Sequence, residues 1–211
     1  SNDKTFSDSI PLYMIKGNEQ NFLEVTCTKA FKYVRYVGPN GKRPSFSQLE
    51  VYGEESNEDS AEPEKIYQPT NLPLIVVNTE NGAMPADKDK DTQIKSNIVI
   101  IKDGKVNTKG SGTIKYRDNS TLDPAKKSFR IKFDEKTNVL DLPAKAKKWV
   151  LFANMYDKTL LRNRIGYKMS TIFGLKYTPA CHHIDLIING DFKGNYLLCD
   201  QIDVNKDRVK L

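Results

Sequence analysis

The residues best suited to chemistry lie in two stretches, 114–133 and 145–164. The first reads IKYRDNSTLDPAKKSFRIKF, a polar loop that runs into a basic strand. Small polar side chains let a backbone approach a phosphate group closely, and fixed cations neutralise its charge. The order of residue types therefore predicts a nucleotide-phosphate site, whose candidates are Asn119, Ser120, Thr121, Lys127, Arg130 and Lys132.

The second stretch reads KAKKWVLFANMYDKTLLRNR, an apolar strand followed by a helix. Apolar residues recur at helical spacing and predict a long helix over 157–173, with Asp157 as its N-cap and Gly174 after its end. Arg162, near the helix start, could reach a phosphate or form a structural ion pair. The pattern leaves both roles open.

The positive charge is concentrated around these two stretches. The chain has 211 residues and a formal net charge of +6, yet residues 108–170 hold 15 Lys+Arg against 6 Asp+Glu. Such a local excess favours an anionic partner, although a solvated basic face would have the same composition. The charge alone leaves phosphate, nucleic acid and an acidic surface open as partners, and the resemblance described below favours a nucleotide over nucleic acid.

Strands must position these residues, and the pattern predicts several. Phe129, Ile131 and Phe133 alternate with charged residues, so one face of this strand is buried and the other carries cations. Asp103-Gly104 and Asn189-Gly190 each separate two β-prone runs, which indicates hairpins. Several antiparallel strands and one long helix predict an α+β fold, a curved antiparallel sheet with the helix packed on it.

A composition change divides the chain. Residues 54–65 read EESNEDSAEPEK, which is typical of a solvated linker. We therefore expect a small β segment at 1–53, an acidic linker at 54–69 and a larger domain at 70–211. The sequence lacks a run of 18 apolar residues, so we expect no membrane-spanning segment.

The three cysteines are Cys27, Cys181 and Cys199. They include no C-x-x-C pair, and the pattern predicts no metal site. A disulfide between Cys181 and Cys199 is one interpretation, and buried free thiols are the favoured one.

Five motifs resemble the spore coat protein H (CotH) kinase family, whose members have an atypical protein-kinase-like fold. They read IKYRDNST, AKKSFRIKF, LPAKAKKWVLFANMYDKTLLRNRIGYKMS, LKYTPACHHIDLIINGDFKGNYLLCDQI and NKDRVKL. The resemblance as a whole covers about residues 70–211. The resemblance implies a kinase-like N-lobe that is truncated at its C-terminal end. In it, 119–121 would cover the phosphates and 197–203 would run along the adenine.

The resemblance also implies the activity of the full-length protein. That protein would transfer the γ-phosphoryl group of ATP to a protein hydroxyl, with Mg²⁺, and the acceptor is not indicated. The family's catalytic and metal-binding aspartates belong to an Asn-x-Asp-like and a Trp-Asp-x-Asp-like segment that 1–211 does not contain. We therefore assign no catalytic and no metal-binding residue, and expect this chain alone to be inactive. It also departs from the family at Asp118 and Leu122, where Gly and Trp are usual.

Residues 31–53, FKYVRYVGPNGKRPSFSQLEVYG, resemble the end of a discoidin-like (F5/8 type C) domain, a fold often used to bind carbohydrate. The alternative function is therefore a non-catalytic cell-surface or matrix protein that binds carbohydrate through this module. The same resemblance predicts a secreted or cell-surface location, with an export signal that this chain does not include.

Overall fold

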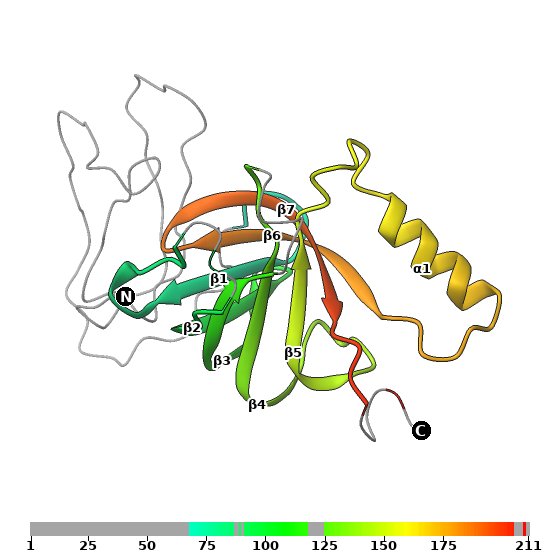
Figure 1. Cartoon of the computed structure of the whole chain (residues 1–211), viewed down its shortest axis with the longest axis horizontal. Helices are drawn as coiled ribbons and strands as arrows, with labels where there is room; N and C mark the ends of the chain where they lie inside the picture. Colours follow the sequence, from blue (N-terminus) through cyan, green and yellow to red (C-terminus); the bar gives the residue numbers. More distant parts are fainter. Residues whose placement is uncertain (1–67, 87–88, 90, 118–124, 205–208, 210–211) are drawn as a thin grey trace.

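The described part of the protein is a closed β-barrel with one helix beside it (Figure 1). The structure is a computed structural model that describes residues 68–86, 89, 91–117, 125–204 and 209. The predicted β segment at 1–53 and almost all of the linker at 54–69 lie outside these residues.

Seven strands, one short 3-10 helix and one α-helix follow each other along the chain. In order they are β1 (Leu74–Thr79), η2 (Glu80–Gly82), β2 (Ile94–Lys102), β3 (Lys105–Tyr116), β4 (Phe129–Asn138), β5 (Lys145–Phe152), α1 (Arg162–Ile172), β6 (Cys181–Ile188) and β7 (Asp191–Asp200).

The order of strands around the barrel is β1-β2-β3-β4-β5-β7-β6. All neighbouring pairs are antiparallel except β1 and β6, which pair in parallel from Leu74 opposite Asp185 to Val77 opposite Ile188. This parallel contact joins the first strand to the sixth and closes the sheet. A closed barrel leaves neither strand with an unpaired edge at this seam.

Two tight turns build the hairpins that the sequence predicts. Asp103 and Gly104 join β2 to β3 with φ of 53° and 76°, and Asn189 and Gly190 join β6 to β7 with φ of 52° and 83°. Two successive positive φ values match the twist of antiparallel strands, and Asx-Gly pairs adopt them at low cost. Both predicted hairpins are confirmed.

The barrel interior is the hydrophobic core. Phe129, Ile131 and Phe133 of β4 point into it, as the alternation predicts, and Trp149 of β5 is fully buried there. A second, smaller apolar cluster lies across β1, β2 and β6 and contains Leu74, Val76, Val99, Ile101 and Ile187. Because β1 has apolar neighbours on both faces, all six of its residues are buried.

The predicted α+β class is wrong. The described chain is mostly strand, and its sheet is closed rather than an open curved sheet of the kinase N-lobe type. The individual strands were predicted from local patterns, whereas closure depends on the pairing of β1 with β6, about a hundred residues apart. Local alternation carries no information about such a distant pairing.

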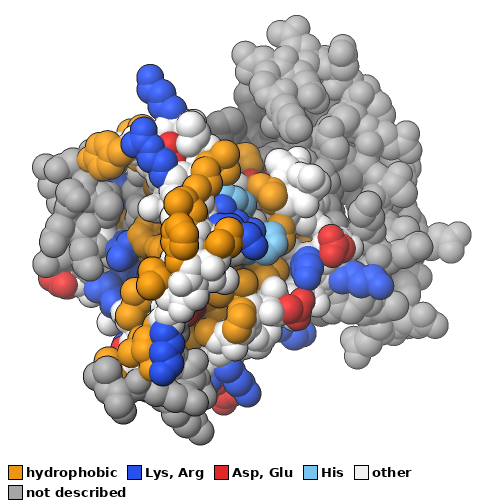
Figure 2. Space-filling view, turned by 90° about the vertical axis from the view of Figure 1, so that its right-hand side faces the viewer, with side chains coloured by type: hydrophobic (Ala, Val, Ile, Leu, Met, Phe, Trp, Pro, Cys, Tyr) orange, Lys and Arg blue, Asp and Glu red, His pale blue; other side chains and the backbone are white. Residues whose placement is uncertain are grey.

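The helix also differs from its prediction. It covers Arg162–Ile172 and buries none of its residues, so it is not packed on the sheet. Figure 1 shows it standing off the barrel, and Figure 2 shows hydrophobic side chains on the face that carries it. These exposed residues of the helix and its flanks are Leu161, Ile165, Met169, Ile172, Phe173 and Leu175.

Candidate functional site

A basic pocket lies on the outer face of the barrel, beside α1. One row of paired residues crosses four strands at this place: Lys115 of β3 lies opposite Arg130 of β4, and Arg130 lies opposite Val150 of β5. Val150 in turn lies opposite Cys199 of β7. Their sequence neighbours Ile114, Ile131 and Trp149 point into the core, so the row faces outward.

Residues from four further segments complete a pocket of about 260 Å³. The lining residues are Lys115, Arg117, Arg130, Val150, Phe152, Tyr167, Pro179, Cys199, Asp200, Gln201 and Ile202. The guanidinium of Arg117 lies 4.4 Å from the centre of the Phe152 ring, a cation–π contact that fixes its position. Three cations therefore converge beside an apolar wall, which is the combination that a nucleotide needs: charge for phosphates and a surface for the base.

Two further groups line the pocket, one on α1 and one at the end of β7. Tyr167 of α1 is half-buried, and its burial, together with nearby Cys199 and Cys181, raises the pKa of its phenol. Asp200 is 4 % exposed, and one of its carboxylate oxygens accepts a hydrogen bond of 2.8 Å from the backbone N–H of Ala180. The hydrogen bond to Asp200 holds the segment between α1 and β6 against the pocket.

The predicted site residues differ in whether they line the basic pocket. Arg130 lines the basic pocket. Lys132 points to the same side of β4 but is exposed and does not line the pocket. The ammonium of Lys127 lies 5.7 Å from the ring centre of Tyr116, outside the pocket lining. The predicted covering loop at 119–121, with Asp118 and Leu122, lies outside the described residues.

Sequence reasoning missed Lys115 and Arg117 as ligand candidates. Both lie in the IKYR segment, just before the predicted phosphate-covering loop. Arg130 faces outward between Ile131 and Phe129, and the same alternation puts Lys115 outward beside Ile114. Only the register between β3 and β4 places the two cations side by side.

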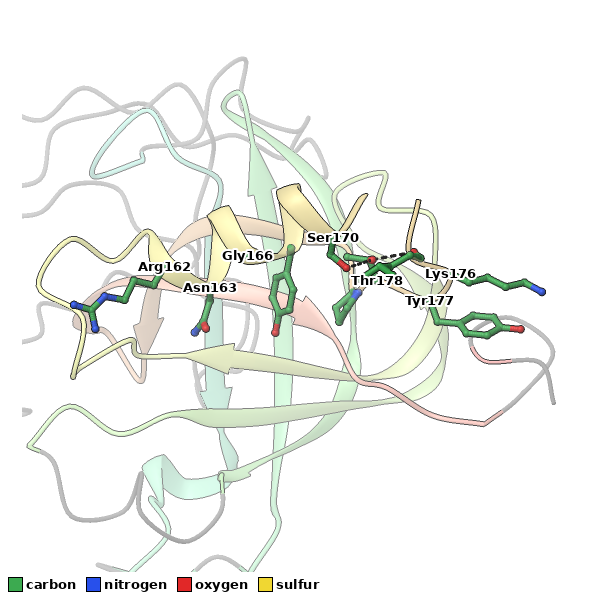
Figure 3. A pocket seen from close by; sticks show the side chains of 10 residues that line it. Arg162, Asn163, Gly166, Ser170, Lys176, Tyr177 and Thr178 are labelled. Atoms are coloured by element: carbon green, nitrogen blue, oxygen red, sulfur yellow. Dashed lines mark hydrogen bonds between the residues drawn. The ribbon is translucent and has the colours of Figure 1, made fainter. Parts of the chain in front are cut away.

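Arg162 lies apart from the basic pocket. Its guanidinium is 3.7 Å from a carboxylate oxygen of Asp157, so the structural ion pair is the role that the structure supports. It also lies at one end of a shallower pocket under α1, with Lys176 at the other end (Figure 3). Within this second pocket the hydroxyls of Ser170 and Thr178 are 2.7 Å apart.

A partly buried cation lies beside β6 and β7. The ammonium of Lys126 donates a hydrogen bond to the carbonyl oxygen of Asn195 and lies 4.5 Å from the ring centre of Tyr196. Burial lowers the pKa of Lys126 and raises the pKa of nearby Asp185, whose carboxylate accepts a hydrogen bond from Thr70. Lys126 therefore anchors the loop before β4 to the barrel and is not aimed at the basic pocket.

Neither a metal centre nor a membrane span is found in the part of the chain that the structure describes. There, no three His, Cys, Asp or Glu side chains gather in a way that could hold a metal ion. Nor is any helix in these described ranges long and apolar enough to cross a membrane.

Part of the chain matches a known protein family. Residues 114–211 match the family described as CotH kinase protein, which confirms the resemblance for this part of the chain. The match begins within β3, and it includes every residue that lines the basic pocket. No curated protein matches the chain.

Proposed function

From the match of residues 114–211 to the CotH kinase family, we propose that the basic pocket binds the phosphates of ATP. The observation that carries this proposal is the convergence of Lys115, Arg117 and Arg130 on one pocket wall. Kinase chemistry consists mainly of positioning and charge stabilisation of phosphoryl groups, and these three cations would supply the charge. Val150 and Phe152 would offer the apolar surface for the base.

In the full-length protein, this pocket would serve ATP-dependent phosphoryl transfer to a protein hydroxyl. Mg²⁺ bridges phosphate oxygens in such reactions and is held by carboxylates. Among the described residues that line the pocket, Asp200 is the sole carboxylate, and it already accepts the N–H of Ala180. The pocket fits phosphates better than it fits the metal, so we assign to it the binding of nucleotide.

Nucleotide titration tests the phosphate-binding role. ATP is titrated into the wild-type chain and into Arg130→Gln by calorimetry at low ionic strength. Loss of one charged hydrogen bond to phosphate should weaken binding about tenfold or more. Lys132→Gln is the matched control, since Lys132 shares the strand and the outward side with Arg130 but does not line the pocket. Equal weakening by both variants, or no binding at millimolar ATP, would contradict the proposal.

A transfer assay tests whether residues 1–211 bind nucleotide without catalysing phosphoryl transfer. Residues 1–211 are incubated with labelled ATP, Mg²⁺ and a generic protein acceptor. We expect nucleotide binding without labelled acceptor, because the resemblance assigns the metal-binding aspartates to other segments of the family. Turnover by residues 1–211 would show that the transfer machinery is already present in them.

A further inference from the structure

Cys181 and Cys199 lie directly opposite each other on β6 and β7. The backbone N–H of Asp200 donates to the carbonyl oxygen of Ala180, so the pair 180/200 is a hydrogen-bonded pair. Pairs alternate along antiparallel strands, and 181/199 is therefore a non-hydrogen-bonded pair, with Cα atoms about 4.5 Å apart. This separation falls within the range that a disulfide can span, about 4.4–6.8 Å.

The two thiols are free and chemically unequal. Cys199 is buried, whereas Cys181 is partly exposed. A guanidinium nitrogen of Arg164 on α1 lies 3.8 Å from the sulfur of Cys181 and also donates to its carbonyl oxygen. The hydrogen bond from the Cys199 thiol, followed by the charge of Arg164, lowers the pKa of Cys181, and the same contact raises the pKa of Cys199. A thiolate at Cys181 beside a protonated thiol at Cys199 is the arrangement of an attacking and a resolving cysteine.

We propose that Cys181 and Cys199 form a redox site that reacts with low-molecular-weight disulfides of the glutathione type and closes into a cross-strand disulfide. The Cys181 thiolate attacks one sulfur of the disulfide, forms a mixed disulfide and releases one thiolate. That thiolate takes the proton of Cys199, whose sulfur then attacks the Cys181 sulfur and releases the second low-molecular-weight thiolate. Two protein thiols are oxidised and one external disulfide is reduced to two thiols.

Closure changes two neighbouring features. Cys199 lines the basic pocket, so the disulfide forms in its wall. The anion beside Arg164 disappears, and one of the two contacts between this arginine and Cys181 weakens. The site therefore links the oxidation state to the attachment of α1. It stands on the geometry of the cysteine pair and does not depend on nucleotide binding.

Oxidation in defined buffers tests the site. A Cys27→Ser variant, which leaves the 181/199 pair as the sole cysteines, is equilibrated with oxidised and reduced glutathione under native conditions. Peptide mapping by mass spectrometry should find one 181–199 disulfide, reversed by excess reduced glutathione. Cys181→Ser should stay unmodified at Cys199, since the remaining thiol is buried. A persistent glutathione adduct at Cys181 without closure, or closure only after unfolding, would overturn the proposal.

The rate of the reaction tests the part assigned to Arg164. In the same background, Arg164→Gln should slow the first attack several-fold near neutral pH and shift the pH–rate profile to higher pH, because the cation that favours the thiolate is lost. Arg164→Lys keeps the charge and should restore most of the rate. A profile unchanged in Arg164→Gln would overturn the assignment of Arg164.

Discussion

At the scale of single residues, Asp157 shows how one side chain sets the start of a helix. Its two carboxylate oxygens accept the backbone N–H of Thr159 at 3.0 Å, the hydroxyl of Thr159 at 2.7 Å and the backbone N–H of Arg162 at 2.8 Å. The predicted N-cap is wrong, because α1 begins at Arg162 and Leu161 holds the N-cap position. Asp157 instead holds the turn that leads into the helix. These hydrogen bonds lower the pKa of Asp157.

Asp157→Ala should loosen the start of α1. Three hydrogen bonds to the 157–162 turn are lost, so amide hydrogen exchange at Thr159 and Arg162 should become faster, while exchange in the barrel stays unchanged. Asp157→Asn keeps one acceptor oxygen and should give an intermediate rate. If exchange at Arg162 is the same in all three proteins, the carboxylate does not hold this turn.

The same residue predicts a pH dependence. Its pKa is lower in the folded than in the unfolded chain, so the unfolded chain binds the proton more tightly. The stabilising contribution is complete above the ordinary pKa of 3.8 and is lost as the pH falls through the folded value. The difference in amide hydrogen-exchange rate at Thr159 and Arg162 between wild type and Asp157→Ala should therefore vanish in strong acid. A difference that persists there would contradict the titration of Asp157.

At the scale of elements, α1 is oriented unusually. Its pocket-lining residues include Asn163, Gly166 and Ser170, which are small or polar. Its apolar residues Ile165 and Met169 are about half exposed, at 52% and 48%. The apolar residues of α1 do recur at helical spacing, as predicted, but the described barrel does not cover the stripe that they form. Helical spacing of apolar residues shows that the helix has an apolar face. It does not show which part of the protein covers that face.

Native-state hydrogen exchange should show that the amides of α1 exchange faster than those of the barrel. An eleven-residue helix without buried residues is only marginally stable by itself, so its amides should exchange through local opening. The amides of β5, β6 and β7 should exchange only on global unfolding. Protection of α1 equal to that of the barrel would contradict this division.

At the scale of the whole molecule, the barrel core carries the stability. Trp149 is fully buried, and its indole N–H donates a hydrogen bond of 3.2 Å to the carbonyl oxygen of Ala146. It belongs to the core cluster that draws residues from all seven strands of the barrel. Because the sheet is closed, a cavity at this position has few ways to collapse.

Trp149→Ala should therefore lower the free energy of unfolding by about 3–5 kcal/mol. Ile165→Ala on the exposed side of α1 is the control and should change it by less than about 0.5 kcal/mol. Urea unfolding monitored by circular dichroism measures both. Similar losses in the two variants would mean that α1 contributes to the same core.

Local patterns predicted most strands and both hairpins, since Asp103-Gly104 and Asn189-Gly190 encode their turns within a few residues. They also identified Arg130 as an outward cation. They could not identify Lys115 as its neighbour, because this depends on the register between two strands. They also could not predict the closed barrel, because the pairing of β1 with β6 is set by the whole fold.

The parallel seam between β1 and β6 has a consequence for biosynthesis. β1 leaves the ribosome long before Cys181–Ile188, its second neighbour, and at about 5–20 residues per second the delay is roughly 5–20 seconds. During this time a strand that begins with the apolar run Leu74–Val77 offers one unpaired edge, which favours aggregation. Nascent chains stalled before β6 should thus be protease-sensitive, and chains stalled well after β7 should be resistant. Resistance before β6 emerges would show that the other strands fold without the seam.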